Sequence, residues 1–278
     1  MTLQQLLTEG KEHLKRCEVP DYEWDACLLL FHVFDMDRGS FFMRRQETTS
    51  MEKEETYRKL IAKRGERIPL QHIIGTTEFM GLTFKVNEHV LIPRQDTECI
   101  VEEVLKISSG KKVLDMCTGS GCIAVSIAKL GNPDFVTAVD ISQEALQVAE
   151  ENAKVNDVTI EFILSNLFAN CSGEYDIIVS NPPYIETAEL EKLMAEVREH
   201  EPRLALDGKE DGLYFYRKII DKAPDFLREG GSIFFEIGYN QKEEVSKLLF
   251  ERGFSQIEGK QDLAGLNRMV SAVWKKGN

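Results

Sequence analysis

The chain has 278 residues, 42% of them hydrophobic and 29% charged, which suits one α/β domain accompanied by a smaller one. Its net charge of −13, with no block rich in lysine and arginine, argues against a partner held mainly through phosphate groups. No apolar run can cross a bilayer and residues 1–11 lack the features of a signal peptide, so we expect a cytoplasmic protein without a membrane partner. The six cysteines include no Cys-x-x-Cys pair and the five histidines are scattered, which predicts reduced thiols and no metal site.

Helices are predicted for about the first 65 residues. Leucines recur at helical spacing at the beginning of the chain, and Asp21 is expected to cap a second helix. Thr49 followed by Glu52 matches a capping box ahead of another helix. Because this stretch shows no catalytic cluster, residues 1–68 are assigned to an N-terminal helical domain of a kind that more often recognises a partner than performs chemistry.

A β-hairpin is predicted to join this domain to the rest of the chain. Apolar residues alternate through residues 70–86, with a break at Gly75 and Thr76, so residues 69–88 are assigned to a hairpin linker. Asp96 or Thr97 is expected to cap the helix that follows.

Strands and helices alternate from residue 111 onward, and Ser142 is expected to cap one of the helices. The pattern predicts a mostly parallel sheet with helices on both faces, so residues 89–278 are assigned to one α/β domain. Strands are predicted over residues 113–116, 135–140, 159–164, 175–179, 232–237, 254–258 and 269–274. Helices are predicted near residues 190–199, 213–227 and 241–252.

The fourth of these strands leads into the most informative segment, Asn181-Pro182-Pro183-Tyr184. Two prolines cannot continue a sheet ladder, so Asn181 is presented where the strand ends, which is where ligands bind in open α/β sheets. The Asn181 side-chain carbonyl and the Pro182 backbone carbonyl offer two acceptors beside the flat ring of Tyr184. This arrangement suits a planar group that carries an –NH₂, such as an amide or an adenine. The alternative interpretation is a rigid turn with a surface tyrosine.

A glycine-containing loop after the first strand indicates a ligand that approaches the backbone closely. Its glycines, Gly119 and Gly121, are not followed by the Lys-Ser/Thr pair that binds phosphates in a P-loop. Asp140 ends the second strand 19 residues after Gly121, where an acid can accept both ribose hydroxyls, unless it only caps the next helix. A site for a nucleoside that has no phosphate-binding loop suits S-adenosylmethionine as the ligand. Asp115 is expected to place negative charge near the amino-acid tail of this cofactor. The loop residues assigned to the cofactor are Cys117, Thr118, Gly119, Ser120 and Gly121.

The end of the third strand offers a site for an adenine ring. Asn166 can bind its edge and Leu167 or Phe168 can pack on its face, although a polar loop beside core residues fits equally well. Asn166, Leu167 and Asn181 complete the set of residues expected to contact the cofactor.

In these motifs the sequence resembles the HemK/PrmC-type protein-(glutamine-N5) methyltransferases, which act on peptide chain release factors. The resemblance implies a Rossmann-like, class I S-adenosylmethionine-dependent methyltransferase sheet with a small N-terminal helical domain joined by a β-hairpin. It also implies that the helical domain helps to engage the release factor, and that the glutamine of a Gly-Gly-Gln loop is methylated, with S-adenosylhomocysteine as the product. We expect a monomer that binds no nucleic acid directly. The matching segments are residues 69–75, 91–94, 96–98, 114–121, 138–142, 181–184, 201–202, 205–206, 211–213, 236–238 and 262–265.

On this resemblance Asn181, Pro182 and Tyr184 are the catalytic residues, and the same three with Pro183 bind the substrate glutamine. The Asn181 and Pro182 carbonyls would accept the two amide N–H bonds and orient the nitrogen for direct displacement at the methyl group. No strong general base is required, because an N-alkylated amide cation loses its proton readily.

Three positions depart from the family pattern. Cys117 stands where many members have glycine, which costs about 1 kcal/mol if the position needs a positive φ. Asn166 stands where an aspartate is common, so its contact with adenine can differ. Gln95 replaces a frequent proline, with no evident chemical consequence.

Other functions share part of this pattern. An adenine-N6 methyltransferase acting on nucleic acid would use the same turn, but it needs base flipping and a positive groove, which the net charge argues against. A ribosomal-protein glutamine methyltransferase would use the same chemistry on another partner. A binding module that has lost catalysis is disfavoured because Asp140 and Asn181 are both present.

Overall fold

The computed structural model describes residues 1–262 and 264–275, which form two compact units. The first unit comprises Met1–Gly75 together with Met194–His200, and the second comprises Thr76–Leu193 and the chain from Glu201 onward. The segment Met194–His200 therefore belongs to the first unit, although the sequence on both sides of it belongs to the second. The sequence-based boundaries at residues 68 and 88 remain a proposal.

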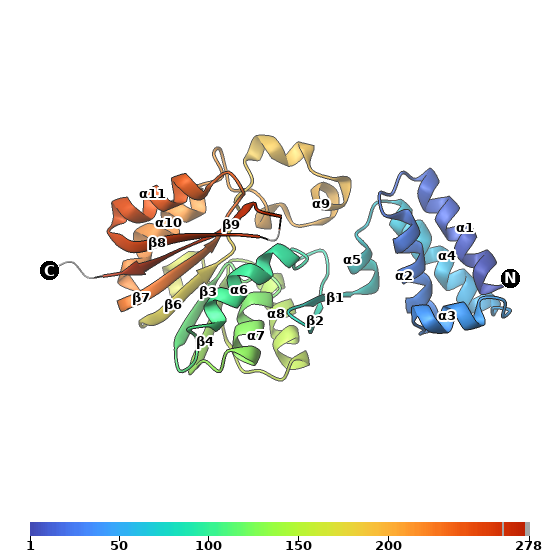
Figure 1. The fold of residues 1–278 in the computed structure, drawn as a ribbon, viewed down its shortest axis with the longest axis horizontal. Helices are drawn as coiled ribbons and strands as arrows, with labels where there is room; N and C mark the ends of the chain where they lie inside the picture. Colours follow the sequence, from blue (N-terminus) through green and yellow to red (C-terminus); the bar gives the residue numbers. More distant parts are fainter. Residues whose placement is uncertain (263, 276–278) are drawn as a thin grey trace. The chain divides into compact units, whose positions relative to one another are not determined.

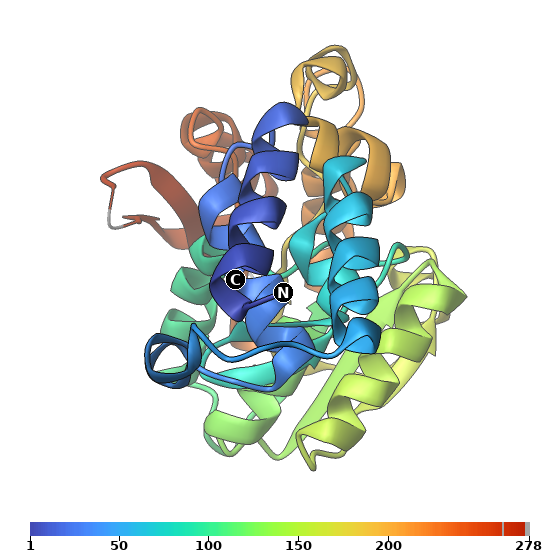
Figure 2. The same ribbon diagram turned by 90° about the vertical axis from the view of Figure 1, so that its right-hand side faces the viewer.

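The first unit is a helical bundle. Helices α1, α2 and α4 pack against one another, as Figures 1 and 2 show. Their apolar faces form a common core whose most buried members include Leu6, Leu14, Leu29, Leu30 and Tyr57. The helices of this unit are α1 Leu3–Arg16, α2 Tyr22–Phe34, α3 Arg38–Arg44, α4 Met51–Gly65, α5 Leu70–Ile74 and α9 Ala195–His200.

Two of the predicted caps in this unit are wrong. Asp21 occupies the N-cap position of α2 but its side chain makes no capping hydrogen bond there. Helix α4 is capped by Ser50, whose hydroxyl accepts from the Lys53 backbone N–H. Thr49 does not form the expected capping box, because its hydroxyl donates to the Met1 carbonyl and to Glu54.

A buried ion cluster fastens α9 to the bundle. Arg64 on α4 contacts Asp25 of α2 at 2.7 Å and Glu196 of α9 at 2.8 Å, and these three side chains are at most 10% exposed. Arg67 forms a second, bidentate pair with Glu196. The two guanidinium groups outweigh the effect of burial and hold the pKa of Glu196 at about 2. Glu196 is therefore ionised at physiological pH, and its charge is neutralised inside the unit.

The second unit is built on a mixed sheet. Within the described residues seven strands pair in the order β5-β4-β3-β6-β7-β9-β8, parallel except where β9 pairs with β7 and β8 (Figure 1). The predicted Rossmann-like sheet is confirmed, and the strand order reverses between β3 and β6, which is where such sheets bind ligands. The strands are β3 Lys112–Met116, β4 Phe135–Asp140, β5 Glu161–Leu164, β6 Tyr175–Ser180, β7 Leu227–Glu236, β8 Phe254–Gln261 and β9 Asn267–Trp274.

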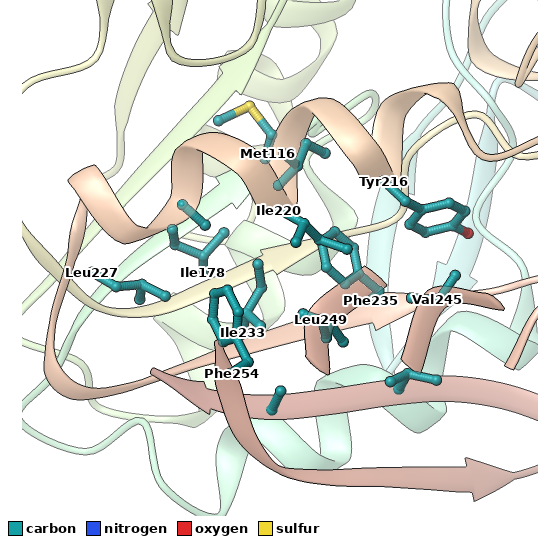
Figure 3. Close-up of a cluster of buried hydrophobic side chains, with 14 of the residues drawn as sticks. Met116, Ile178, Tyr216, Ile220, Leu227, Ile233, Phe235, Val245, Leu249 and Phe254 are labelled. Carbon is teal, nitrogen blue, oxygen red and sulfur yellow. The ribbon is translucent and has the colours of Figure 1, made fainter. Parts of the chain in front are cut away.

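Helices cover both faces of this sheet. The first face packs against α10 Tyr214–Lys222 and α11 Lys242–Arg252, through a cluster that includes Ile178, Tyr216 and Phe235 (Figure 3). The opposite face packs against three helices and the hairpin residues Phe79 and Phe84. Those three helices are α6 Glu98–Leu105, α7 Cys122–Leu130 and α8 Gln143–Val155. The two clusters hold the strand ends rigidly, which positions the loops that follow them.

Several elements differ from the prediction. The hairpin consists of β1 Thr76–Phe79 and β2 Leu82–Lys85, whereas the residues just before it form helix α5 and not a strand. The helix predicted near residues 190–199 is interrupted by extended Leu193, which separates a 3-10 turn from α9. Helix α10 ends at Lys222 because Pro224 follows, and β7 begins as early as Leu227 with a bulge in its pairing to β6. In the described part of the chain no helix is both long and apolar enough to span a membrane.

Candidate functional site

A cavity of about 240 Å³ lies at the carboxyl ends of the central parallel strands. Four successive strands, β3 to β6, each send residues of their following loop into its wall. The lining from these loops is Met116, Cys117, Thr118, Gly119, Ser120, Asp140, Ile141, Ser142, Ser165, Asn166, Leu167, Asn181 and Pro183. The fold brings the candidate residues at these strand ends to one cavity, except Gly121, Pro182 and Tyr184, which are not part of its wall.

The loop between β3 and α7 turns sharply by using three residues with positive φ. Gly119 has a φ of 54° and Gly121 one of 78°. A Cβ on Gly121 would lie 2.9 Å from the Cβ of Ala149, so only glycine lets this turn pack on α8. Cys117 adopts a φ of 65°, so the position does require the left-handed region, and its side chain costs about 1 kcal/mol there.

Asp115 holds this loop from beneath. Its fully buried carboxyl accepts from the Thr118 hydroxyl at 2.6 Å and from the Ala124 backbone N–H at 3.1 Å. Burial raises the pKa of Asp115 to about 7, against the lowering effect of these hydrogen bonds. Asp115 is not part of the cavity wall, so within the protein its observed role is to shape the loop, and its expected charge near the cofactor tail stays a prediction.

Asp140 lies in the cavity wall at the end of β4. One carboxylate oxygen accepts from the Gly119 N–H at 2.8 Å and the other accepts from the Ser142 N–H at 2.9 Å. Each oxygen keeps lone-pair capacity for a ligand hydroxyl. The predicted cap of α8 is confirmed for Ser142, whose hydroxyl accepts from the Ala145 N–H.

The third loop supplies the lateral wall. Asn166 is exposed at the cavity, and Leu167 follows it with a φ of 51° that turns the chain sharply. The Ser165 hydroxyl donates to the Leu167 carbonyl at 2.7 Å and fixes this turn. Asn166 and Leu167, from the loop after β5, thus line the same cavity as Asp140 at the end of the neighbouring strand β4.

The Asn-Pro-Pro-Tyr turn divides its residues between the cavity and the core. Asn181 and Pro183 line the cavity, whereas Pro182 and Tyr184 are not part of its wall. The Asn181 amide Nδ2 donates to the Thr97 hydroxyl at 3.4 Å, which leaves its Oδ1 for a ligand. Gln241 donates to the Tyr184 carbonyl at 3.0 Å, and this contact helps to hold the turn in place.

A buried carboxyl, Glu236 at the end of β7, lies behind this turn. The Tyr184 hydroxyl is 3.5 Å from Glu236 Oε1, and the Tyr216 hydroxyl donates to the Glu236 backbone carbonyl. Burial raises the pKa of Glu236 to about 7 and raises that of Tyr184 as well. The Tyr184 side chain is therefore neutral and lies partly buried next to an ionisable acid.

Comparison with known proteins supplies the family of this chain. The family described as "PrmC N-terminal domain" matches residues 5–75, and the "Methyltransferase small domain" family matches residues 95–209. A release factor glutamine methyltransferase of Clostridium botulinum is 40% identical over 280 residues, covering 98% of this chain and 99% of the relative.

The chain belongs to the release factor glutamine methyltransferase family.

A second member of this family, from Geobacter sulfurreducens, is also 40% identical, over 97% of this chain and 95% of its own length. The solved structure of a methyltransferase from Pyrococcus furiosus shares the fold, with a TM-score of 0.54 and 18% identity over 71% of this chain and 91% of that one. The family resemblance seen in the sequence is confirmed, and the chain is an enzyme that transfers methyl groups. One matching motif includes Leu263, which lies outside the described residues.

The cavity of this methyltransferase also contains residues that the sequence argument did not select. Thr97 was expected as a helix cap and as part of the motif at residues 96–98, yet it makes no capping hydrogen bond and instead contacts Asn181. Distant segments complete the wall; some of their residues belong to the matching family motifs, but the sequence assigned none of them to the site. These additional lining residues include His89, Leu91, Pro93, Arg94, Pro202, Leu204, Ala205 and Phe215.

Proposed function

We propose that the chain uses S-adenosylmethionine to methylate the side-chain amide nitrogen of the glutamine in a Gly-Gly-Gln loop of a peptide chain release factor. Family membership supports the reaction class. The observation that carries the proposal is that one cavity joins the Asp140 carboxylate to the Asn181 amide. A nucleoside site and an acceptor for an –NH₂ group are thereby brought side by side.

The residues around Asp140 fit the proposed cofactor. The space in front of Gly119 is open, since a Cβ there would meet no heavy atom within 4 Å. Arg94 is the only arginine or lysine among the described residues of the wall, so the site suits a nucleoside without phosphates. Asp140 would bind the ribose, Asn166 and Leu167 the adenine, and Cys117, Thr118 and Ser120 the remainder. When bound, the cofactor supplies an electrophilic methyl group on a cationic sulfur.

Asn181 and Pro182 would prepare the substrate amide. The lone pair of an amide nitrogen is delocalised into its carbonyl, so the nitrogen is a poor nucleophile. Two carbonyl acceptors on its N–H bonds orient the nitrogen and stabilise the positive charge that develops on it. In this proposal Asn181 Oδ1 and the carbonyl of Pro182, which stands between the wall residues Asn181 and Pro183, are these acceptors, and Pro183 packs on the amide. Tyr184, which lies outside the wall, supports the turn from behind through Glu236.

The remaining parts of the proposal concern partners and location. We propose that residues 1–68 help to engage the release factor, that residues 69–88 form the linker, and that residues 89–278 perform catalysis. A monomer in the cytoplasm, without nucleic acid or a membrane as partner, would suit this task.

The proposed substrate is tested by incubating the full chain with labelled S-adenosylmethionine and a purified release factor. We expect one methyl group on the glutamine of the Gly-Gly-Gln loop and none on a release factor whose motif ends in alanine. The two glycines matter because they let the loop enter a narrow cavity without side-chain clashes. Methylation of adenine in DNA, or of a ribosomal protein in preference to the release factor, would contradict the proposal.

Asp140→Ala is expected to weaken binding of S-adenosylmethionine at least tenfold. The ribose hydroxyls lose a charged acceptor, and such hydrogen bonds contribute about 1.5–3 kcal/mol each. Isothermal titration calorimetry measures the change, with Asp225→Ala at an exposed position as the matched control. An unchanged affinity in a folded Asp140→Ala protein would remove Asp140 from the ribose site.

A further inference from the structure

Two buried side chains outside the Asn-Pro-Pro-Tyr segment lie directly behind Asn181. Thr97 accepts from Asn181 Nδ2 at 3.4 Å, and its hydroxyl lies near enough to the carboxyl group of Glu236 to lower the pKa of that group. Thr97 and Glu236 are each only 2% exposed, so water does not compete for these contacts. Glu236 Oε2 has no hydrogen-bond partner among the described residues. A buried acid therefore lies next to the hydroxyl that contacts the amide in the cavity wall, and one of its oxygens, Oε2, is left without a partner among the described residues.

Which of these groups donates a hydrogen bond and which accepts one depends on the charge of Glu236. A carboxylate can only accept hydrogen bonds, so an ionised Glu236 draws the hydroxyl proton of Thr97 toward itself. The Thr97 oxygen is then an acceptor, and the Asn181 group that faces it must be the NH₂. Asn181 Oδ1 consequently faces away from Thr97. A protonated Glu236 can instead donate, which would free the Thr97 proton to bind Asn181 Oδ1 and favour the opposite amide orientation.

We propose that Thr97 and Glu236 are positioning residues that hold the Asn181 amide with its carbonyl toward the substrate. This inference rests on the proposed function, in which that carbonyl accepts an N–H of the substrate glutamine. With the amide turned over, the Asn181 NH₂ would face the substrate NH₂ and the two donors would repel each other.

The surroundings of Glu236 set the pH at which this arrangement holds. Burial is the main cause that raises its pKa to about 7, and Asp96 raises it further. Arg268, Thr97 and Tyr184 act in the opposite direction. Arg268 also pairs with Asp96 at 3.1 Å and with Asp262 at 2.9 Å, which shares its charge among three acids. Because the ionised form is the active one, the methyl-transfer rate rises as the pH increases through about 7.

The test uses the full chain and a release factor, with single-turnover methylation measured at saturating cofactor from pH 6 to pH 9. Thr97→Val removes the hydroxyl at nearly constant volume, and we expect the rate to fall about tenfold or more while cofactor affinity is unchanged. Thr97→Ser keeps the hydroxyl and should recover most of the rate. Glu236→Gln cannot ionise, so its rate should be low at pH 8 and should no longer rise between pH 6 and pH 8.

These measurements separate the inference from the proposed function. A wild-type chain that methylates no release factor would overturn the proposed function itself. A wild-type chain that does so, accompanied by a Thr97→Val rate within twofold of wild type, would overturn the positioning role. If Glu236→Gln does not fold, the wild-type pH profile and the two Thr97 variants still decide the question. A wild-type rate that does not change between pH 6 and pH 8 would contradict the role of Glu236.

Discussion

Asn181→Ala is expected to lower the single-turnover rate of methyl transfer by about 10²-fold or more while leaving cofactor binding nearly intact. The loss is large because one preorganised acceptor disappears at the reacting nitrogen, where charge develops in the transition state. The side chain of Asn181 contacts Thr97, and Asp140 stands at the end of a different strand, so the cofactor side keeps its geometry. Rapid-quench measurement with labelled cofactor, paired with calorimetric titration, tests both halves of this expectation.

Two variants sharpen this result. Asn181→Asp keeps an acceptor but loses the NH₂ that contacts Thr97, and it adds a charge that must be desolvated or protonated, so its rate should also be low. Asn166→Ala is the matched control at the other end of the cavity. We expect it to weaken cofactor binding and to leave the rate at saturating cofactor close to that of wild type. Near wild-type rates for both Asn181 variants would remove this residue from the mechanism.

Arg64→Ala is expected to destabilise the helical unit by about 3–5 kcal/mol. The substitution removes a buried guanidinium that pairs with Asp25 and Glu196 and also donates to the Ile68 carbonyl. Both carboxylates would remain buried with one partner fewer, and Asp25, whose pKa burial already raises, would have to take up a proton or rearrange. Chemical denaturation of the full chain, followed by circular dichroism, measures the loss.

A second arginine in the same unit provides the control for this experiment. Arg44 pairs with Glu47 on the surface, where the two side chains are 48% and 55% exposed. Arg44→Ala should cost less than about 1 kcal/mol, because exposed ion pairs contribute little. Equal effects of the two substitutions would show that the Arg64 cluster stabilises the unit no more than a surface pair does.

The architecture of the second unit could be predicted because its signals are local. Short β-branched strands alternate with amphipathic helices, and the strand ends carry Asp140 and Asn181. A parallel sheet brings such ends to one edge, so the cavity followed from strand order without knowledge of side-chain contacts. The strain at Cys117 was expected only if this position, which is glycine in many family members, needs a positive φ, and the observed φ of 65° meets that condition.

The side-chain contacts within the site could not be predicted from the sequence. Thr97 precedes a helix, and a threonine there has the same sequence signature whether it caps the helix or serves a distant partner. Its contact with Asn181 joins residues 84 positions apart. Glu236 was recognised only as part of a motif, because its burial depends on packing around β7. The distribution of the Asn-Pro-Pro-Tyr residues between cavity and core likewise depends on how the turn packs.

The placement of residues 194–200 in the helical unit restricts how a gene for such a protein can be recombined. These residues lie in the sequence between the Asn181 turn and the cavity residues Pro202 and Leu204, yet they pack with the first 75 residues. An exchange of only the first 75 codons would leave Glu196 without its arginine partners on α4 and the following loop. The two segments must therefore be inherited together, and a designer who replaces the helical unit while keeping the second unit has to exchange both.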